Sequence, residues 1–338
     1  MPTVSVILVN FNGERLLGDC FNSLKAQTYR DFDTVFVDNG SSDNSLKVAR
    51  ELMPEIRSVA LEGNTGFAGG NNAGLKESRG KYIVLLNNDT ECAPDFLAEL
   101  VRAIESAPKD VRVGMVAPKI LSFFDRTQID SVGGLLMGPD GIGIGRGRGE
   151  RDEGQYDALT DILMPSGCAA LLTREMLDET GLFADDFFAY CEDMDFGLRA
   201  VWAGWNAVSA PRAVVYHKYS ASSSSYSAFK MQLVERNHYF VALKNFTLAM
   251  LVAFPFWTWY RYLLMLYAVL CGKGKGRAAA SEKITKLIGA FIKGHWQALL
   301  GTPRQLRRRR KIKRRSSLQF RLKLKPHRTT MTKIILSE

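Results

Sequence analysis

A strand that runs directly into a carboxylate is the first place in this chain where chemistry is expected. Residues 82–86 are all apolar or aromatic, and Asn87, Asn88 and Asp89 follow them. Such a run suits a strand covered on both faces, as in a parallel sheet, and parallel sheets bind ligands beyond the carboxyl ends of their strands. We therefore expect Asp89 to lie where a divalent cation or a phosphorylated ligand binds. For an isolated motif, an Asx-turn that ends the strand is the alternative.

Three other predicted strands also end in residues suited to bind a ligand. Asn10, Phe11 and Asn12 follow the first strand, the run D-N-G-S-S-D from Asp38 follows the second, and residues 64–74, rich in Gly and Asn, follow the third. Each run taken alone is equally a turn, a loop or a helix N-cap. At one edge of a sheet, however, their backbone and amide groups can approach a nucleotide closely, and Asp38 can accept a hydrogen bond from a base. Together the strand ends predict a nucleotide-binding edge.

The order of the elements predicts the sheet that brings these ends together. Strand-like and amphipathic stretches alternate through the first 110 residues, which indicates βαβ units, an α/β class and a largely parallel sheet. The expected strands are residues 4–9, 34–37, 57–61 and 82–86, and the expected helices are residues 14–27, 43–52, 68–78 and 94–106. Further along, we expect strands at 167–172 and 207–216, a helix at 174–180 and a helix that ends at residue 202.

Residues 111–165 look less regular and contain the glycine-rich segment Gly138–Gly149, which holds Arg146 and Arg148. This segment does not fit the G-x-x-x-x-G-K-[ST] pattern of a P-loop. We expect it to be a flexible surface loop or a loop on the acceptor side.

Composition points to a globular protein with a basic tail. From Gly301 to Glu338 there are 14 Lys or Arg and one acid, and subtracting this +13 from the net charge of +10 leaves residues 1–300 at −3. The five cysteines form no C-x-x-C pair and have no His at metal-ligand spacing, which suits reduced thiols in a cytoplasmic setting. The N-terminus reads as a strand and not as a signal peptide.

An apolar stretch at Phe246–Gly272 has one charge, Arg261, and an interior Pro255. It is long enough to span a bilayer, which needs about 20 residues, but an Arg at mid-bilayer costs about 2.5–3.5 kcal/mol. The many aromatic residues around Arg261 favour a helix pair that lies in the membrane interface. A membrane span and a buried helical hairpin are the alternatives.

The basic run from Arg307 to Arg315 is a second signal for a membrane. Each such residue contributes about 1 kcal/mol of attraction near anionic lipid. Nucleic acid is the rival partner, but it is disfavoured because the tail has few aromatics for base stacking and no recognisable binding fold.

Eight motifs in their order along residues 3–240 carry a resemblance to a known family. They read V-I-L-V-N-F-N-G, V-D-N-G-S-S-D-N-S, N-T-G-F-A-G-G-N-N-A-G, L-L-N-N-D-T, P-S-G-C-A-A-L-L-T-R, F-F-A-Y-C-E-D-M-D-F-G-L-R, V-Y-H-K-Y-S and E-R-N-H-Y-F. With them the chain resembles glycosyltransferase family 2, whose members are inverting enzymes. It looks most like the rhamnosyltransferase-type members that build bacterial cell-surface polysaccharides. The implied fold is GT-A, a Rossmann-like three-layer α/β sandwich with a mostly parallel mixed sheet.

The resemblance implies a metal site that uses Mg2+ or Mn2+. Asn87-x-Asp89 stands where the family has D-x-D, and Asp89 would bind the cation that bridges the donor's diphosphate. Asn87 in place of the first Asp keeps an oxygen ligand but removes a negative charge. His217 matches a late histidine that completes the site; a strand-end His bonded to backbone is the alternative.

The resemblance also implies a donor site and a catalytic base. Asp38, with the backbone near Asn10 and Phe11, would hold the nucleobase. Glu192-Asp193 matches the family's acidic pair, and Asp193 is the expected base that takes the proton of the acceptor hydroxyl. Arg199 is spaced to pair with Asp195 in a helix, and it is also a candidate to face the diphosphate. The expected nucleotide-sugar-binding residues are Asn10, Phe11, Asn12, Asp38, Asn64, Gly66, Phe67, Asn71, Asn87, Asn88 and Arg199.

The sequence thus predicts an inverting glycosyltransferase at the cytoplasmic face of the membrane. Its donor would be of the dTDP-rhamnose or UDP-sugar type, and its acceptor a glycan or a lipid-linked glycan. The expected segments are a GT-A domain at residues 1–240, an apolar helical segment at 241–300 and the basic tail at 301–338. A non-catalytic nucleotide-sugar-binding protein and a nucleic-acid-binding protein acting through the tail are the alternatives, although the former has no need of Glu192 and Asp193.

Overall fold

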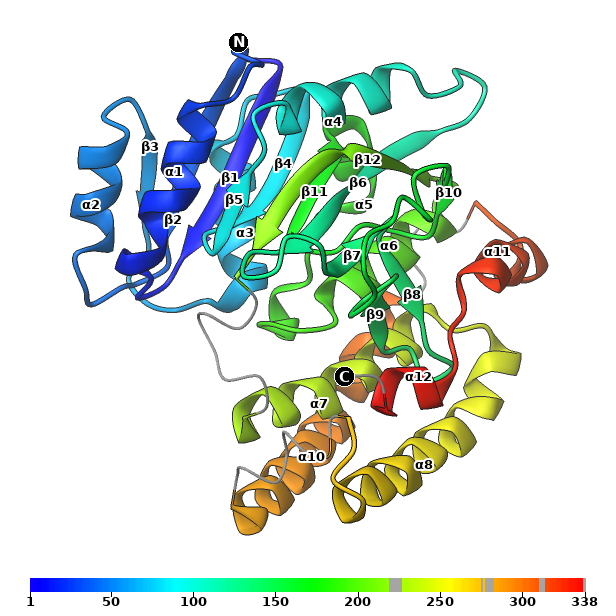
Figure 1. Cartoon of the computed structure of the whole chain (residues 1–338). Helices are drawn as coiled ribbons and strands as arrows, with labels where there is room; N and C mark the ends of the chain where they lie inside the picture. Colours follow the sequence, from blue (N-terminus) through cyan, green and yellow to red (C-terminus); the bar gives the residue numbers. More distant parts are fainter. Residues whose placement is uncertain (219–226, 275, 277–282, 310–313, 337–338) are drawn as a thin grey trace. The chain divides into compact units, whose positions relative to one another are not determined.

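The computed structural model describes residues 1–218, 227–274, 276, 283–309 and 314–336 (Figure 1). The chain divides into two compact units. The first unit comprises Met1–Leu135, Gly145–Phe188 and Trp205–Ser222, and the second comprises Leu136–Ile144, Ala189–Gly204 and Ser223–Glu338. This division cuts across the predicted segments 1–240, 241–300 and 301–338, because two stretches from the middle of the chain belong with the C-terminal helices.

A mixed sheet forms the centre of the first unit. Within the described residues it has ten strands, and its main order is β10-β12-β6-β11-β4-β1-β2-β3. β1 pairs in parallel with β2 and β4, β2 with β3, and β6 with β12, whereas β11 runs antiparallel between β4 and β6. β5 and β7 add antiparallel pairings to β12 and β6. The α/β class and the largely parallel N-terminal half of the sheet are as predicted.

The bounds of the elements in this unit follow the predicted alternation closely over the first 110 residues. The strands are β1 (Val4–Asn10), β2 (Phe32–Asp38), β3 (Arg57–Ala60), β4 (Tyr82–Asn87), β5 (Thr90–Cys92), β6 (Val113–Ser122), β7 (Ile129–Val132), β10 (Asp161–Ile162), β11 (Ala169–Thr173) and β12 (Asn206–His217). The helices are η1 (Glu14–Leu16), α1 (Leu17–Lys25), α2 (Ser45–Leu52), α3 (Gly66–Glu77), α4 (Phe96–Glu105), α5 (Arg174–Thr180) and η2 (Asp185–Phe187).

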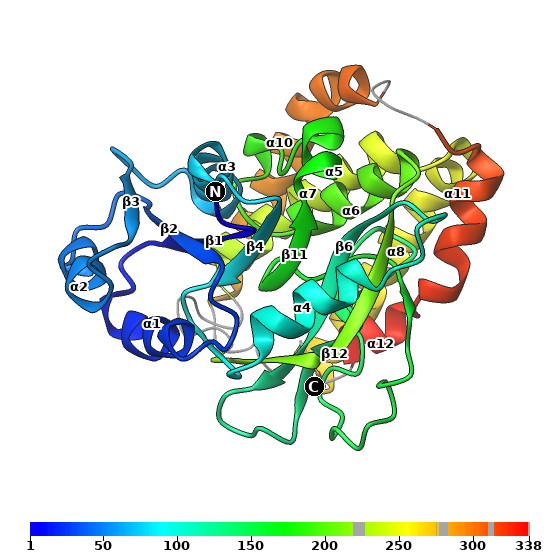
Figure 2. The same cartoon turned by 90° about the horizontal axis from the view of Figure 1, so that it is seen from above.

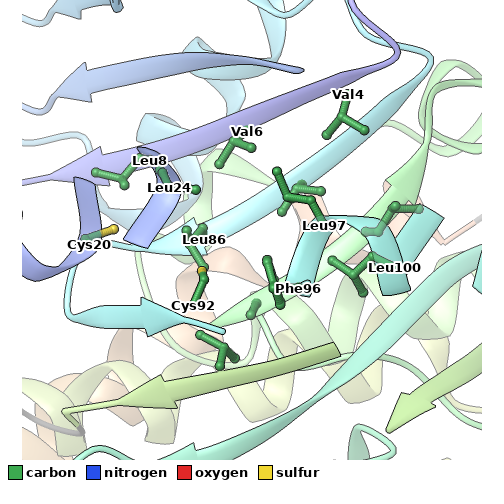
Figure 3. Packing of buried hydrophobic residues seen from close by; sticks show 14 of the residues in the cluster. Val4, Val6, Leu8, Cys20, Leu24, Leu86, Cys92, Phe96, Leu97 and Leu100 are labelled. Carbon is green, nitrogen blue, oxygen red and sulfur yellow. The ribbon is translucent and has the colours of Figure 1, made fainter. Parts of the chain in front are cut away.

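Helices cover both faces of the sheet and give the three layers. Val4, Val6 and Leu8 of β1 point into a core shared with α1 and α4 (Figure 3). The alternate residues of β1 face α3, which lies with α5 on the opposite side of the sheet (Figure 2). α3 approaches β1 closely because it presents glycine there: a Cβ on Gly74 would sit 2.5 Å from Cγ2 of Ile7. Successive side chains of β1, which point to opposite faces of the sheet, are thus packed against helices on both faces.

The region expected to be irregular contains one of the central strands. β6 is almost fully buried, although Gly114, Pro118 and Lys119 interrupt its apolar pattern. Lys119 is buried because two carboxylates neutralise it: its Nζ lies 2.8 Å from Asp152 and 2.7 Å from Asp157. A buried charge with partners outside the strand cannot be anticipated from local sequence, so the prediction for residues 111–165 was wrong here.

The second unit is mostly helical. It contains most of the short strands β8 (Leu135–Met137) and β9 (Gly143–Gly145), whose outer residues Leu135 and Gly145 belong to the first unit. Its helices are α6 (Glu192–Trp202), α7 (Ala228–Asn245), α8 (Leu248–Leu270), α10 (Ile284–Arg308), α11 (Ser317–Leu324), η3 (Lys325–His327) and α12 (Met331–Leu336). Trp202 of α6 stacks on Phe320 of α11 with ring centroids 4.0 Å apart, and its indole N–H donates to the carbonyl of Asn245. These contacts tie α6 to the C-terminal helices.

The glycine-rich segment Gly138–Gly149 is mostly buried and is not a surface loop. Ile142 and Ile144 join a cluster with Ala268 of α8 and Ile334 of α12. Its glycines place the backbone among these helices, where a Cβ on Gly138 would meet Cδ1 of Ile334 at 2.4 Å. The expected flexible surface loop is therefore wrong for the part of the segment in this unit, whereas the alternative of a loop on the acceptor side stays a prediction.

Residues 246–272 contain one helix, α8 (Leu248–Leu270), and not the predicted pair. Pro255 lies inside this helix, and Arg261 is buried instead of lying among aromatics at a surface. No helix within the described residues combines the length and apolar character needed to cross a membrane. Of the basic run from Arg307 to Arg315, residues 310–313 lie outside the described residues.

Candidate functional site

The carboxyl ends of the parallel strands meet at one edge of the sheet, as predicted. In the register of the sheet, Asn10 lies beside Asp38, and Val9 lies beside Asn87. Asn88 and Asp89 follow directly after β4. The sequence motifs at three strand ends are therefore neighbours because the strands are parallel and in register.

Asparagine side chains connect these strand ends. Nδ2 of Asn88 donates to Oδ1 of Asn10 at 2.7 Å, and Nδ2 of Asn10 donates to Oγ of Ser41 at 3.3 Å. The N–H of Ser41 in turn donates to Oδ1 of Asp38 at 3.4 Å. Asn10, Asp38 and Asn88 are all buried. The hydrogen bonds hold the three predicted binding residues in one arrangement.

Asn39 extends this arrangement to the loop before α3, and sequence reasoning did not single it out. Its Nδ2 donates to the carbonyl of Gly66 at 3.0 Å and to Oδ1 of Asn64 at 3.2 Å, while its Oδ1 accepts from the N–H of Thr65 at 2.9 Å. Gly66 has φ +76°, and a Cβ there would sit 2.4 Å from the carbonyl oxygen of Phe188. In the sequence, the only signal for Asn39 was its place in the turn-like run D-N-G.

The other predicted donor-site residues divide into two groups. Phe11 is 43% exposed just beyond β1, and Oδ1 of Asn12 accepts from the N–H of Ser42 at 2.8 Å, so both lie at the edge. Asn71 instead lies inside α3, where its buried amide donates to the carbonyl of Phe67 at 2.9 Å. The ring of Phe67 packs against Phe183 at 5.5 Å. These two side chains have structural contacts that account for them.

The pairing of β5 with β12 brings Asp89 and His217 together. Thr90 lies opposite His217 in this antiparallel pair, and the carbonyl of Asp89 accepts from the N–H of Lys218 at 2.9 Å. Oδ1 of Asp89 lies 3.3 Å from Nε2 of His217. The alternative in which His217 bonds only to backbone is wrong, because Nδ1 of the ring lies 2.7 Å from Oδ2 of Asp130.

The chemistry of this pair fits a hard divalent cation. Among the described residues, Oδ1 of Asp89 is a buried carboxylate oxygen without a hydrogen-bond partner. Oxygen and imidazole donors suit Mn2+, and Mg2+ in nucleotide sites is bound through one or two carboxylates together with substrate phosphates. No group of three or more His, Cys, Asp or Glu side chains in the described part of the chain is arranged to hold a metal. Binding by Asp89 and His217 would thus need oxygens from the donor or from water.

The ionisable groups around His217 shift one another's pKa values. Burial opposes the imidazolium, but contact with the Cys168 side chain and with the carboxylates of Asp130 and Asp89 raises the pKa of His217 above its ordinary value. Burial also opposes ionisation of Asp130, yet the bond to His217 and the charge of Arg148 lower the pKa of that carboxyl. Burial raises the pKa of the Cys168 thiol, which keeps it protonated and unsuited to bind a cation.

The acidic pair Glu192 and Asp193 begins α6 in the second unit. Glu192 is 6% exposed, and its Oε2 has no hydrogen-bond partner in the part of the chain that the structure describes. Burial and then the neighbouring Asp193 carboxylate raise the pKa of Glu192 well above its ordinary value. Asp193 is only half-buried, and its Oδ1 accepts from the N–H of Met194 at 2.8 Å. The neutral form of Glu192 is favoured, which leaves Asp193 as the better proton acceptor.

A strained turn precedes the pair. Tyr190 and Cys191 have φ +68° and +65°, in the left-handed region that side chains disfavour. Asn237 of α7 holds this turn, because its buried Nδ2 donates to the carbonyls of Ala189 at 2.8 Å and Tyr190 at 2.7 Å. Asn237 belongs to the E-R-N-H-Y-F motif, which was the only sequence signal for it.

Asp195 anchors α6 to α7. Its carboxylate accepts from Nζ of Lys244 at 2.6 Å, Nδ2 of Asn245 at 2.8 Å and Nε of Arg199 at 3.0 Å. Burial alone would raise the pKa of Asp195, but Lys244 and Arg199 lower it. The expected pair between Asp195 and Arg199 is present. Arg199 is thus held by its own helix through Nε.

Comparison with known proteins gives consistent results. Residues 5–181 match the model of the family described as Glycosyl transferase family 2. An uncharacterised glycosyltransferase of Nostoc sp. is 34% identical over 31% of this chain and 33% of its own length. The N-acetylglucosaminyl-diphospho-decaprenol L-rhamnosyltransferase of Mycobacterium tuberculosis is 26% identical over 63% of this chain and 75% of its own length. The matches span 25% to 38% of the length of the first three curated relatives.

The fold is also shared with a solved enzyme. A mannosyltransferase from Pyrobaculum calidifontis, solved in complex with GDP-Man and Mn2+, aligns with a TM-score of 0.53 and 19% identity over 88% of this chain and 87% of its own. At this identity the likeness concerns the architecture of the chain alone.

Proposed function

Because the chain belongs to glycosyl transferase family 2 and has the GT-A fold, we propose that it is an inverting enzyme that moves a sugar from a nucleotide-diphosphate donor to a glycan or lipid-linked glycan. The observation that carries the proposal is the edge where Asn10, Asp38 and Asn88 are hydrogen-bonded next to Asp89 and His217. A nucleotide needs polar contacts at its base and compensation of charge at its diphosphate, and both are available along this edge.

Different residues along this edge would bind the base and the diphosphate of the donor. Asp38, which lies opposite Asn10 in the sheet and so near the end of β1 where Phe11 is exposed, would accept a hydrogen bond from the base. The Asn39 contacts hold the loop of Asn64 and Gly66 close to this edge. Asp89 and His217 would hold Mg2+ or Mn2+, which when bound neutralises the charge that grows on the leaving diphosphate. Asn87 adds an oxygen but no charge, so Asp89 carries the negative charge of the motif.

Transfer with inversion requires one base. The acceptor oxygen forms a bond to the anomeric carbon while the bond from that carbon to the diphosphate oxygen breaks, and the hydroxyl proton goes to Asp193. Glu192 favours its neutral form, so it is suited to donate a hydrogen bond to the sugar or the acceptor. Asn237 and the network around Asp195 would keep α6 in place during this step.

The Mycobacterium tuberculosis relative supports a more specific substrate class. That protein is named for transfer of L-rhamnose to a sugar on a diphospho-decaprenol lipid. For this chain we accordingly propose a donor of the dTDP-rhamnose or UDP-sugar type, and an acceptor linked to a lipid diphosphate in bacterial cell-surface polysaccharide synthesis.

Such an acceptor implies work at the cytoplasmic face of the membrane, and exposed apolar residues support this location. Along α8, apolar side chains recur every three or four residues and are exposed: Leu248, Val252, Phe256, Trp259, Leu263, Leu266 and Leu270. α10 exposes Ile288, Ile292, Trp296, Leu299 and Leu300, together with the cationic residues Lys286, Lys293 and Arg307. Apolar stripes with adjacent cations are typical of helices that lie on anionic lipid.

A donor screen tests the proposal most directly. The full chain would be incubated with UDP-, GDP- and dTDP-sugars, Mg2+ or Mn2+, and a short lipid-diphosphate-linked sugar as acceptor, and the released nucleotide and the product anomer would be measured. We expect turnover with one donor class, an inverted linkage and loss of turnover with a chelator. Donor binding without turnover on any acceptor would favour the non-catalytic alternative, and a retained anomer would contradict the single-base mechanism.

A further inference from the structure

Asp130 occupies an irregular position in the sheet of the first unit. In the antiparallel pair of β6 and β7, Leu121 lies opposite Ile129 and Ile120 lies opposite Ser131, so Asp130 has no partner in the ladder. This is a β-bulge, which redirects a side chain and often occurs beside functional sites. The bulge thus makes the contacts of the Asp130 side chain of functional interest.

The Asp130 carboxylate is directed at the imidazole of His217. Its Oδ2 lies 2.7 Å from Nδ1 of that ring, while Nε2 lies 3.3 Å from Oδ1 of Asp89. Two carboxylates thus contact opposite nitrogens of one imidazole. In metal sites, a histidine usually donates its second N–H to a carboxylate, which fixes the tautomer and the orientation of the ring.

Arg148 holds the other oxygen of this carboxylate. Its Nη2 lies 3.2 Å from Oδ1 of Asp130. Arg148 comes from the glycine-rich segment, whose Gly145 packs so closely that a Cβ there would sit 2.4 Å from the carbonyl oxygen of Asp130. This end of the segment, which fits no phosphate-binding pattern, therefore packs directly around the bulge.

We propose that Asp130, held by Arg148, is a positioning residue for the cation site. It accepts the Nδ1 proton of His217 and so keeps Nε2 of the ring directed toward Asp89. The inference rests on the proposed function, because it assumes that Asp89 and His217 bind a cation. It deepens that function by giving two further residues control over metal affinity through His217.

Mn2+ binding to the full chain, followed by electron paramagnetic resonance of the free ion, tests this role without any turnover. We expect Asp130→Ala to weaken the affinity for Mn2+ by about 10- to 100-fold. Asp130→Asn should weaken it less, because the amide oxygen still accepts from Nδ1. The matched control is Asp110→Ala, an exposed aspartate before β6, which should stay within about twofold of wild type.

A double variant separates positioning from general damage. If Asp130 acts through the ring, adding Asp130→Ala to His217→Ala should weaken Mn2+ binding no further. The nitrogen resonances of His217, identified by their loss in His217→Ala, should change in Asp130→Asn while those of the other three histidines stay unchanged. This conservative variant also decides the question if Asp130→Ala does not fold.

The outcomes distinguish the two proposals. Mn2+ affinity that falls in His217→Ala but stays within twofold in both Asp130 variants would overturn the role of Asp130 alone. An equal loss in the presence and absence of the His217 ring would also overturn it. A wild-type chain that binds no Mn2+ would overturn the cation site itself, and the role of Asp130 with it.

Discussion

Arg261 of α8 and Glu235 of α7 form a bidentate ion pair inside the second unit. Nη1 lies 2.6 Å from Oε1 and Nη2 lies 2.8 Å from Oε2, and Nε also lies 2.8 Å from Oδ2 of Asp140. Both partners are buried. The pair fixes which side of α8 faces the core, and the apolar stripe from Leu248 to Leu270 is left on the outside. The single charge that argued against a membrane span thus sets the orientation of the exposed face.

Loss of this pair should destabilise the protein strongly. Arg261→Met leaves Glu235 and Asp140 as buried carboxylates without their cation, which typically costs about 3–5 kcal/mol of unfolding free energy. Denaturant unfolding monitored by tryptophan fluorescence measures this. Arg307→Met, at an exposed position of α10, is the control and should change stability by less than about 0.5 kcal/mol. Equal effects of the two substitutions would contradict the inferred burial of charge.

Stability should fall as the pH drops from about 6.5 toward 4. Burial and then the charge of Arg261 lower the pKa of His238 to about 4, whereas an unfolded His titrates near 6.5. Between these values the unfolded chain binds the proton and the folded chain does not, so unfolding is favoured, by up to about 3 kcal/mol. In His238→Phe this component should be absent. Stability profiles of wild type and variant that run parallel from pH 7 to pH 4 would contradict it.

A methyl group should be tolerated at Gly63, in the loop before α3, and not at Gly66, the first residue of α3. Gly66→Ala would place a Cβ 2.4 Å from the carbonyl of Phe188 at a positive φ, whereas a Cβ on Gly63 meets nothing within 4 Å. We expect Gly66→Ala to cost more than about 1 kcal/mol and to weaken donor binding, with Gly63→Ala near neutral. Calorimetry with the nucleotide measures both effects, and a neutral Gly66→Ala would refute the described loop.

Lipid binding should depend on the exposed face of α8. A double change of Trp259 and Leu266 to Gln removes two exposed apolar side chains, each worth about 1.5–3 kcal/mol if fully buried in lipid, so vesicle affinity should fall at least tenfold. Co-sedimentation with vesicles containing anionic lipid is the measurement. Phe124→Gln alters an exposed aromatic of the first unit and should have no effect. An equal loss in this control would argue against an α8-specific contact.

The two acidic residues of α6 should respond differently to amide substitution. Asp193→Asn removes the proposed base and should lower kcat by about 100- to 10,000-fold while donor binding is retained. Glu192→Gln replaces a carboxyl whose neutral form is favoured by burial and by the Asp193 charge, so kcat should fall by less than about tenfold. Steady-state kinetics together with donor titration give both numbers. The reverse order of effects would transfer the role of base to Glu192.

The sequence alone determined the elements whose signals are local. The apolar runs at 4–9 and 82–86, with the polar residues that follow them, predicted β1, β4 and the shared edge, because parallel strands bring their carboxyl ends together. The pair of Asp195 and Arg199 was equally local, since residues four apart meet on a helix. Motif order was enough to indicate the family.

Tertiary structure decided the contacts that join distant parts of the chain. Asp130 meets His217 across 87 positions because a bulge in β7 redirects one side chain, and no periodicity in the sequence marks that bulge. Arg261 and Lys119 are buried because carboxylates from other segments neutralise them, whereas an unpaired charge would remain in water. Long-range register and charge pairing, which local patterns do not encode, therefore set the surroundings of the candidate cation site and the exposed face of α8.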